Sequence, residues 1–215
     1  MLKQRIISSL FIVPVLVFGF LADRIWFSVM LGALTLVGIW EIVSVTKGKY
    51  YDWEMAQILF FVYAPAIYVA FSLLLAARRL RWIDNGWWLV LSLAGTVAYD
   101  TTAYFVGRSV GRRKITPKIS PNKTWEGTIG GFFGSVATAL LIGQNFLSLE
   151  IALSLIAGIA IGFLAFFGDL LVSWYKRKLG VKDMGKLIPG HGGLLDRIDS
   201  HMLVFYGLFF FQMVS

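Results

Sequence analysis

Three observations on the sequence predict an all-α, polytopic integral membrane protein with about seven transmembrane helices. Of its 215 residues, 58% are hydrophobic and 15% are charged, whereas soluble domains average about 45–50% apolar and about 25% charged residues. The apolar residues gather into stretches near the length of about 20 residues that a helix needs to cross a bilayer. Lysine and arginine concentrate in alternate loops between these stretches. A soluble core of this size could not hide so much apolar surface.

The expected membrane spans follow one another along the whole chain. In order they are Ile6–Ala22, Ile25–Val45, Met55–Ala77, Gly86–Val106, Gly127–Phe146, Ile151–Leu171 and Ile198–Val214. The first resembles a signal peptide, but Phe20 stands where a cleavage site needs a small residue, so we expect this span to be retained. The chain is expected to form one membrane-embedded domain, 1–215, with N-terminal helices in 1–95 and the helices and loops of the site in 96–215.

The loop charges predict the orientation of the chain. With a cytoplasmic N-terminus, 16 of the 20 Lys and Arg residues fall on the cytoplasmic side. Cytoplasmic loops of membrane proteins are enriched in these residues. We therefore expect the loops rich in Lys and Arg to face the cytoplasm. The expected localisation is integral to a bacterial inner membrane, with the active site facing the cytoplasm. The absence of cysteine excludes disulfides, thiolate zinc sites and cysteine nucleophiles.

Polar residues after the sixth span have the chemistry of a phosphate and metal site. Asp169 lies near the end of that span, and a carboxylate close to hydrocarbon usually has a function. If the helix continues, Ser173 and either Lys176 or Arg177 share its face with Asp169. Oxygen ligands beside lysine and glycine suit Mg²⁺ that bridges phosphates.

Glycines separate this helix from two further carboxylates. The stretch Pro189-Gly190-His191-Gly192-Gly193 can bring backbone N–H groups close to a phosphate. Asp196 and Asp199 then share a helical face at the start of the seventh span. Each feature has an ordinary explanation, because such aspartates can cap a helix and the basic residues 176–178 can anchor a helix end. Their combination within about 30 residues favours a site.

Another polar stretch lies between the fourth and fifth spans. Asp100 falls inside the fourth span and needs a polar partner or a wet cavity. The sequence Ser120-Pro121-Asn122-Lys123-Thr124 offers hydroxyl, amide and ammonium groups just before the fifth span. Such groups suit anion binding at a helix start. An ordinary capped helix with a basic anchor is the alternative explanation.

One long run of residues carries a family resemblance. It reads Ser173-x-x-Lys176-Arg177-x4-Lys182-Asp183-x-Gly185-x-x-Ile188-Pro189-Gly190-His191-Gly192-Gly193-Leu194-x-Asp196-Arg197-Ile198-Asp199, with Asp100-x-x-Ala103-Tyr104, Gly107-Arg108 and Ile119–Gly127 upstream. This C-terminal half closely resembles the phosphatidate cytidylyltransferases, the CDP-diacylglycerol synthases. The sequence departs from that family at Val172, where relatives often carry glutamate, and in having fewer residues before Asp100 than many relatives.

The resemblance implies transfer of the CMP moiety of CTP to phosphatidic acid, giving CDP-diacylglycerol and pyrophosphate in phospholipid biosynthesis. It implies Mg²⁺ as cofactor, with a second cation left open. CTP, phosphatidic acid and the lipid bilayer are the expected partners; no nucleic acid is expected, and a homodimer is left open. The expected catalytic residues are Asp169, Asp196, Lys176 and Arg197, with Asp169 and Asp196 as the metal ligands. The expected substrate-binding residues are Asp100, Ser120, Asn122, Lys123, Thr124, Ser173, Arg177, Lys182, Asp183, His191, Gly192, Gly193 and Asp199.

Other activities remain open from the sequence alone. A CTP-dependent polyprenol or lipid kinase would use the same metal and nucleotide contacts, but would transfer the γ-phosphoryl group. A synthase could also make the CDP derivative of another lipid. A membrane transporter of anions would line its pathway with Asp100 and Asp169, although the polar residues cluster on one side of the predicted membrane.

Overall fold

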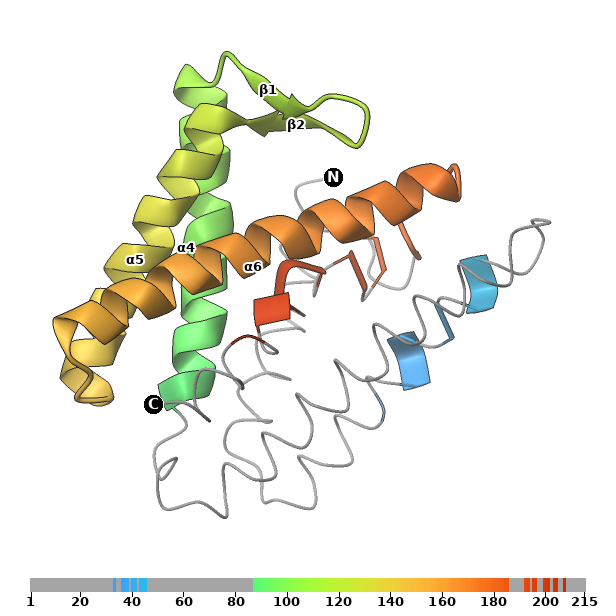
Figure 1. Ribbon diagram of the computed structural model, residues 1–215. Helices are drawn as coiled ribbons and strands as arrows, with labels where there is room; N and C mark the ends of the chain where they lie inside the picture. The colour runs from blue at the N-terminus through green and yellow to red at the C-terminus, as the bar shows by residue number, and fades with distance from the viewer. Residues whose placement is uncertain are drawn as a thin grey trace, which may run out of the picture. The chain divides into compact units, whose positions relative to one another are not determined.

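The computed structural model describes the central part of the chain most completely. The described residues are 33, 36–38, 40, 41, 43–45, 87–185, 192, 193, 195, 196, 199–201, 203, 204 and 207. The predicted spans Ile6–Ala22 and Met55–Ala77 lie outside these residues, whereas Ile25–Val45 and Ile198–Val214 are described in part and are helical where described. The continuous elements are α4 (Trp87–Val110), β1 (Lys114–Thr116), β2 (Ser120–Thr124), α5 (Trp125–Phe146) and α6 (Ile151–Lys178) (Figure 1).

Two compact units divide the chain. The first unit contains Met1–Arg79 and Lys176–Ile198, and the second contains Leu80–Tyr175 and Asp199–Ser215. Most of the continuous elements belong to the second unit, where α4 and α5 lie side by side and α6 crosses them (Figure 1). The single membrane-embedded domain expected from the sequence stays a prediction.

Helices α4 and α5 approach closely because one face of α5 carries glycine. A Cβ atom on Gly130 would lie 2.6 Å from Cγ2 of Val106, and one on Gly131 would lie 2.6 Å from the ring of Tyr99. Gly127 and Gly134 continue this face along the helix. Small residues of this kind let helix backbones pack closely in membranes, where van der Waals contact rather than the hydrophobic effect holds helices together.

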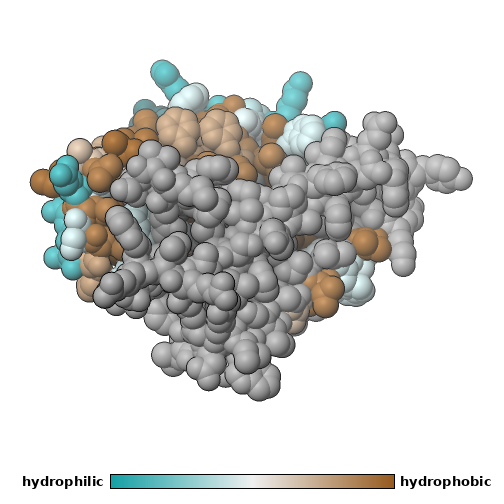
Figure 2. Space-filling model, turned by 60° about the horizontal axis from the view of Figure 1, so that its bottom comes forward, coloured by the Kyte–Doolittle hydropathy of each residue, from teal (hydrophilic) through white to brown (hydrophobic). Residues whose placement is uncertain are grey.

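The core of the second unit forms where α6 meets the α4–α5 pair. Its buried members include Leu91 of α4, Ile142 of α5 and Ile161 of α6. The outer faces of the helices remain apolar: Phe133 is 73% exposed and Phe163 is 51% exposed. Figure 2 shows hydrophobic side chains at the surface of the described residues. Both α5 and α6 are long and apolar enough to cross a membrane, by length and composition.

The three predicted spans in this region are helices, but their ends differ from the prediction. The sixth was expected to end at Leu171, whereas α6 continues to Lys178. It ends where Gly180 adopts a positive φ of 63°. The N–H of Gly180 then bonds to the carbonyl of Arg177 at 3.1 Å, and the N–H of Val181 bonds to that of Lys176 at 3.0 Å. This pair of bonds is a Schellman cap. The last turn carries Lys176, Arg177 and Lys178, so it is polar rather than apolar.

A short β-hairpin corrects the prediction of a wholly α-helical chain. Strands β1 and β2 pair antiparallel, with Lys114 opposite Thr124 and Thr116 opposite Ser120. Pro117 presets the backbone of the turn, which closes with a bond of 3.1 Å from the N–H of Ile119 to the carbonyl of Thr116. Two strands this short leave too little alternation of apolar and polar residues to be predicted from the sequence.

The hairpin leads directly into α5. Thr124 is the N-cap of that helix, and its hydroxyl accepts a bond of 3.1 Å from the N–H of Gly127. Glu126, in the first turn, accepts bonds of 3.1 Å from the N–H of Arg112 and 3.3 Å from that of Arg113. These contacts tie both ends of the hairpin to the start of α5, which fixes the place of Lys123 at the end of β2.

Candidate functional site

Asp169 of α6 lies at the centre of a polar cluster in the second unit. Its Oδ2 atom is 2.8 Å from Nζ of Lys123, in an ion pair whose side chains are 17% exposed for lysine and 31% for aspartate. Its Oδ1 atom accepts a bond of 3.1 Å from the hydroxyl of Ser173, one helical turn further along α6. The ammonium of Lys123 also donates to the carbonyl of Phe166 at 3.3 Å and lies 4.8 Å from the centre of that ring. The hairpin thus positions the ammonium of Lys123 in an ion pair with the carboxylate of Asp169 on α6.

Asp100 of α4 supplies a second carboxylate in this unit. The hydroxyl of Ser200 donates to its Oδ2 atom at 2.9 Å. Asp169 and Lys123 both lie within electrostatic reach of Asp100. The polar partner that an acid within an apolar helix requires is therefore present.

Gly168 lets the segment of Asp199 and Ser200 approach α6 closely. A Cβ atom on Gly168 would lie 2.7 Å from the carbonyl oxygen of Asp199. The carboxylate of Asp199 accepts a bond of 2.8 Å from the N–H of Ser200. A residue with a side chain in place of glycine would push Ser200 away from Asp100. The glycine beside Asp169 therefore helps to assemble the second unit's polar cluster.

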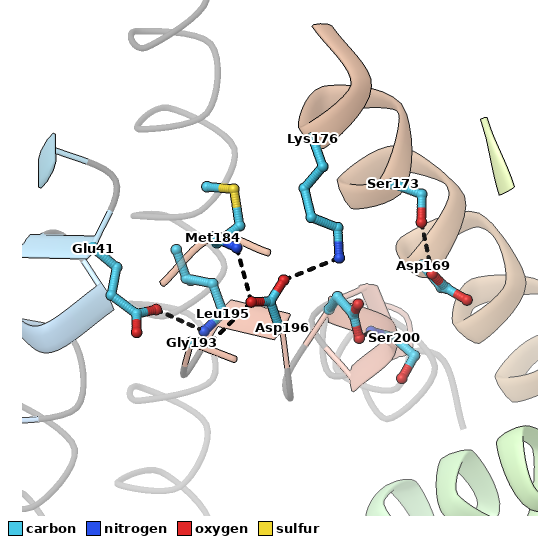
Figure 3. A network of polar contacts seen from close by, with 10 residues as sticks. Glu41, Asp169, Ser173, Lys176, Met184, Gly193, Leu195, Asp196 and Ser200 are labelled. Atoms are coloured by element: carbon cyan, nitrogen blue, oxygen red, sulfur yellow. Dashed lines mark hydrogen bonds and ion pairs between the residues drawn. The ribbon is translucent and has the colours of Figure 1, made fainter. Parts of the chain in front are cut away.

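Asp196 is the centre of a separate network in the first unit. Its Oδ2 atom accepts bonds from the N–H groups of Met184 at 2.8 Å and Gly193 at 2.9 Å, and its Oδ1 atom is 3.0 Å from Nζ of Lys176 (Figure 3). The Asp196 side chain is only 4% exposed. Gly192 has a positive φ of 84°, and a Cβ atom there would lie 2.8 Å from Oδ2 of Asp196. The glycines thus allow the loop backbone to close around one carboxylate.

The sequence analysis missed Glu41, which also contacts this loop. Its residue is 1% exposed, and its Oε2 atom accepts a bond of 3.0 Å from the N–H of Leu195 (Figure 3). Glu41 is the only acidic residue of the predicted span Ile25–Val45. Because an acid within an apolar span usually has a function, that feature was the signal that could have singled it out.

The structure joins some of the predicted site residues and separates others. The prediction that the helix continues, with Ser173 on the same face as Asp169, is confirmed. Asp169 and Asp196 belong to different units, so their sharing of one metal ion stays a prediction. Thr124 caps α5, as the ordinary explanation of its stretch proposed.

The remaining predicted residues differ in burial and in whether the structure describes them. Gly193 belongs to the network around Asp196. Asn122, Arg177, Lys182 and Asp183 are exposed, and Ser120 is half-buried. His191 and Arg197 lie outside the described residues.

Asp169 and Asp196 differ in how well they suit a magnesium ion. Within the described residues no three acidic or histidine side chains gather into a ready-made metal site. Mg²⁺ ordinarily needs only one or two carboxylates, because phosphate oxygens and water complete its shell. Asp169 fits this need, since it is partly exposed and lies beside the hydroxyl of Ser173. Asp196 fits it less well, because three N–H donors already surround its buried oxygens.

Comparison with known proteins gives consistent matches. A model of the cytidylyltransferase family matches residues 52–215. A phosphatidate cytidylyltransferase of Haemophilus influenzae is 32% identical over 98% of this chain and 99% of its own length. One of Pseudomonas aeruginosa is 30% identical over 93% of each chain. An Escherichia coli protein named only as uncharacterized protein YnbB is 48% identical over 61% of this chain, and the match spans 44% of YnbB.

Proposed function

Because the chain belongs to the cytidylyltransferase family, we propose that it transfers the CMP moiety of CTP to phosphatidic acid. The products would be CDP-diacylglycerol and pyrophosphate. The two relatives that match nearly the full chain bear the name of this activity. The single structural observation that carries the proposal is the cluster of Lys123, Asp169 and Ser173, which joins a cation to a partly exposed carboxylate beside an apolar helix.

The proposed reaction exchanges one P–O bond for another. A phosphate oxygen of phosphatidate forms a bond to the α-phosphorus of CTP, and the bond from that phosphorus to the oxygen bridging the α- and β-phosphates breaks. The electron pair of that bond leaves with pyrophosphate. The nucleophile is already an anion, so the site needs no strong general base. It needs instead to suppress repulsion between two anions and to align them.

The residues of the second unit suit this task. Asp169 would hold Mg²⁺, with Ser173 adding an oxygen beside it, and a bound Mg²⁺ would neutralise phosphate charge. Lys123 is proposed to contact the same phosphates, which its ion pair of 2.8 Å with Asp169 supports. An ammonium has three N–H donors, so it can bind a phosphate while keeping its contact with the carboxylate.

The basic residues of the first unit are proposed to bind phosphates as well. Lys176 donates to Asp196, and an ammonium has three N–H donors, so Lys176 is proposed to bind a ligand phosphate as well. The exposed side chains of Arg177 and Lys182 carry charge near the same loop. Arg197 is proposed to act with them. The protein is proposed to have about seven spans and a cytoplasmic N-terminus in a bacterial inner membrane. The site is proposed to face the cytoplasm, because CTP is soluble whereas phosphatidate keeps its tails in lipid.

A labelled-substrate assay tests the proposal. Purified protein in detergent is mixed with Mg²⁺, phosphatidic acid and CTP labelled at either the α- or the γ-phosphorus. Label from the α-position in lipid, with γ-label in pyrophosphate, is the expected result. Label from the γ-position in lipid would instead identify a lipid kinase. Anion uptake into proteoliposomes without any lipid product would identify a transporter.

A further inference from the structure

A second buried carboxylate holds the glycine loop of the first unit from a distant part of the chain. Glu41 lies on a segment that is helical wherever it is described between residues 33 and 45. It contacts Leu195, which is 154 residues further along the sequence. Burying a carboxylate to 1% exposure is costly unless strong hydrogen bonds compensate. Such a cost is understandable where the carboxylate organises a functional loop.

The glycines of the loop fit closely around this carboxylate. A Cβ atom on Gly185 would lie 2.6 Å from Oε1 of Glu41, and one on Gly193 would lie 2.6 Å from Oε2. Real Cβ atoms do not approach other atoms so closely. Glycine at both positions therefore lets the backbone on two sides of the loop lie against Glu41.

Glu41 and Asp196 hold the same loop through neighbouring residues. Asp196 accepts from the N–H groups of Met184 and Gly193. Glu41 accepts from the N–H of Leu195 and lies against Gly185 and Gly193. The two carboxylates thus bind backbone on both the 184–185 and the 193–195 sides of the loop (Figure 3).

We infer that Glu41 is a positioning residue, which fixes the backbone at Gly185, Gly193 and Leu195 so that Asp196 and Lys176 are held in place for the transfer reaction. The inference rests on the proposed function for the reaction that the loop serves, but the positioning itself is structural. Without the carboxylate, the N–H of Leu195 loses an acceptor in a buried place. The backbone at Leu195 and Gly193 would then be held less firmly beside Asp196, and substrates would meet a correctly arranged site less often.

The first test compares Glu41→Gln with a matched control, Glu150→Gln, which changes an exposed glutamate in the loop between α5 and α6. Two readouts are taken: the rate of CDP-diacylglycerol formation, and the rate of trypsin cleavage after the exposed Lys182, two residues before the backbone that Asp196 binds at Met184. We expect Glu41→Gln to lower kcat by about 10-fold or more and to speed that cleavage by a similar factor, because a buried N–H would lose its charged acceptor. Cleavage at other sites and the control variant should remain as in the wild type.

The second test uses the close contact with Gly185 directly. Gly185→Ala forces a methyl group to 2.6 Å from Oε1 of Glu41, whereas in a Glu41→Ala background the nearest atom left is Cα of Gly193, at 3.2 Å. We expect Gly185→Ala to lower Tm clearly in the wild type and much less in the Glu41→Ala background. This double-mutant comparison still measures the contact if Glu41→Gln folds poorly.

Distinct results would overturn the two proposals. Wild-type cleavage at Lys182 together with equal effects of Gly185→Ala in both backgrounds would show that Glu41 does not hold the loop. If the wild-type protein forms no CDP-diacylglycerol, the proposed function is refuted. If Glu41→Gln still speeds cleavage at Lys182 relative to that wild type, the positioning role of Glu41 stands.

Discussion

Replacing Asp169 with asparagine should abolish most of the activity at a small cost in stability. The substitution keeps the size of the side chain but removes its charge, and with it the ion pair to Lys123. Coulomb's law gives about 6 kcal/mol for unit charges 2.8 Å apart at an effective dielectric constant of about 20. The two side chains are 17% and 31% exposed, so water screens the pair and desolvation offsets part of the gain.

The net cost to stability is therefore about 1–2 kcal/mol, well below the Coulomb energy. For a chain of this size such a loss lowers Tm by about 2–8 °C. The effect on catalysis should be much larger, because a bound Mg²⁺ contributes several kcal/mol of charge stabilisation in the transition state. At about 1.4 kcal/mol for each factor of ten, this corresponds to a loss of about 100-fold to 1,000-fold in kcat.

The assay follows α-labelled CTP into lipid over a range of Mg²⁺ concentrations, with Tm measured on the same preparations. Glu150→Gln again serves as the control, because it removes an exposed carboxylate away from the cluster. A kcat reduced at least 100-fold with a Tm within about 8 °C of the wild type would agree with the reasoning. Near-wild-type turnover of Asp169→Asn at ordinary Mg²⁺ would refute it and remove Asp169 from the metal site.

Three further predictions concern other positions. Asp196→Asn should lower the free energy of unfolding by about 3–5 kcal/mol, because it removes the buried partner of Lys176, whose own side chain is only 12% exposed. Thermal or denaturant unfolding measures this, and a loss below about 1 kcal/mol would contradict it. Arg197→Lys should lose substantial activity, because lysine cannot grip a phosphate with two parallel N–H bonds; unchanged kcat/KM would make Arg197 a cytoplasmic anchor. The native protein should be active with Val172. Val172→Glu should reduce stability, because Val172 is 2% exposed. A large rise in activity or Mg²⁺ affinity of this variant would instead show that the native site lacks a ligand.

Local spacing could be read from the sequence, whereas long-range pairing could not. The position of Ser173 one turn after Asp169 follows from the helical period, and the structure confirms it. The pairing of Lys123 with Asp169 depends on the hairpin, which was not predicted. The contact between Asp100 and Ser200 joins residues 100 positions apart, and that between Glu41 and Leu195 joins residues 154 positions apart. A single sequence carries no periodic signal for such contacts, since they depend on how helices pack.

The polar partners of Asp169 and Asp196 imply different tasks for two carboxylates that the sequence treated alike. Asp169 has one cation and one hydroxyl beside it and remains partly exposed, so a ligand can reach its oxygens. Asp196 is enclosed by two backbone N–H groups and an ammonium, so its charge is already used to hold the loop. Loss of activity in an Asp196 variant would therefore not by itself identify a metal ligand, because a disordered loop gives the same result. Mg²⁺ affinity measured together with trypsin cleavage at Lys182 separates the two causes. Loss of a metal ligand weakens Mg²⁺ binding and leaves the cleavage rate unchanged. Loss of the hydrogen bonds to the loop backbone raises the cleavage rate at Lys182.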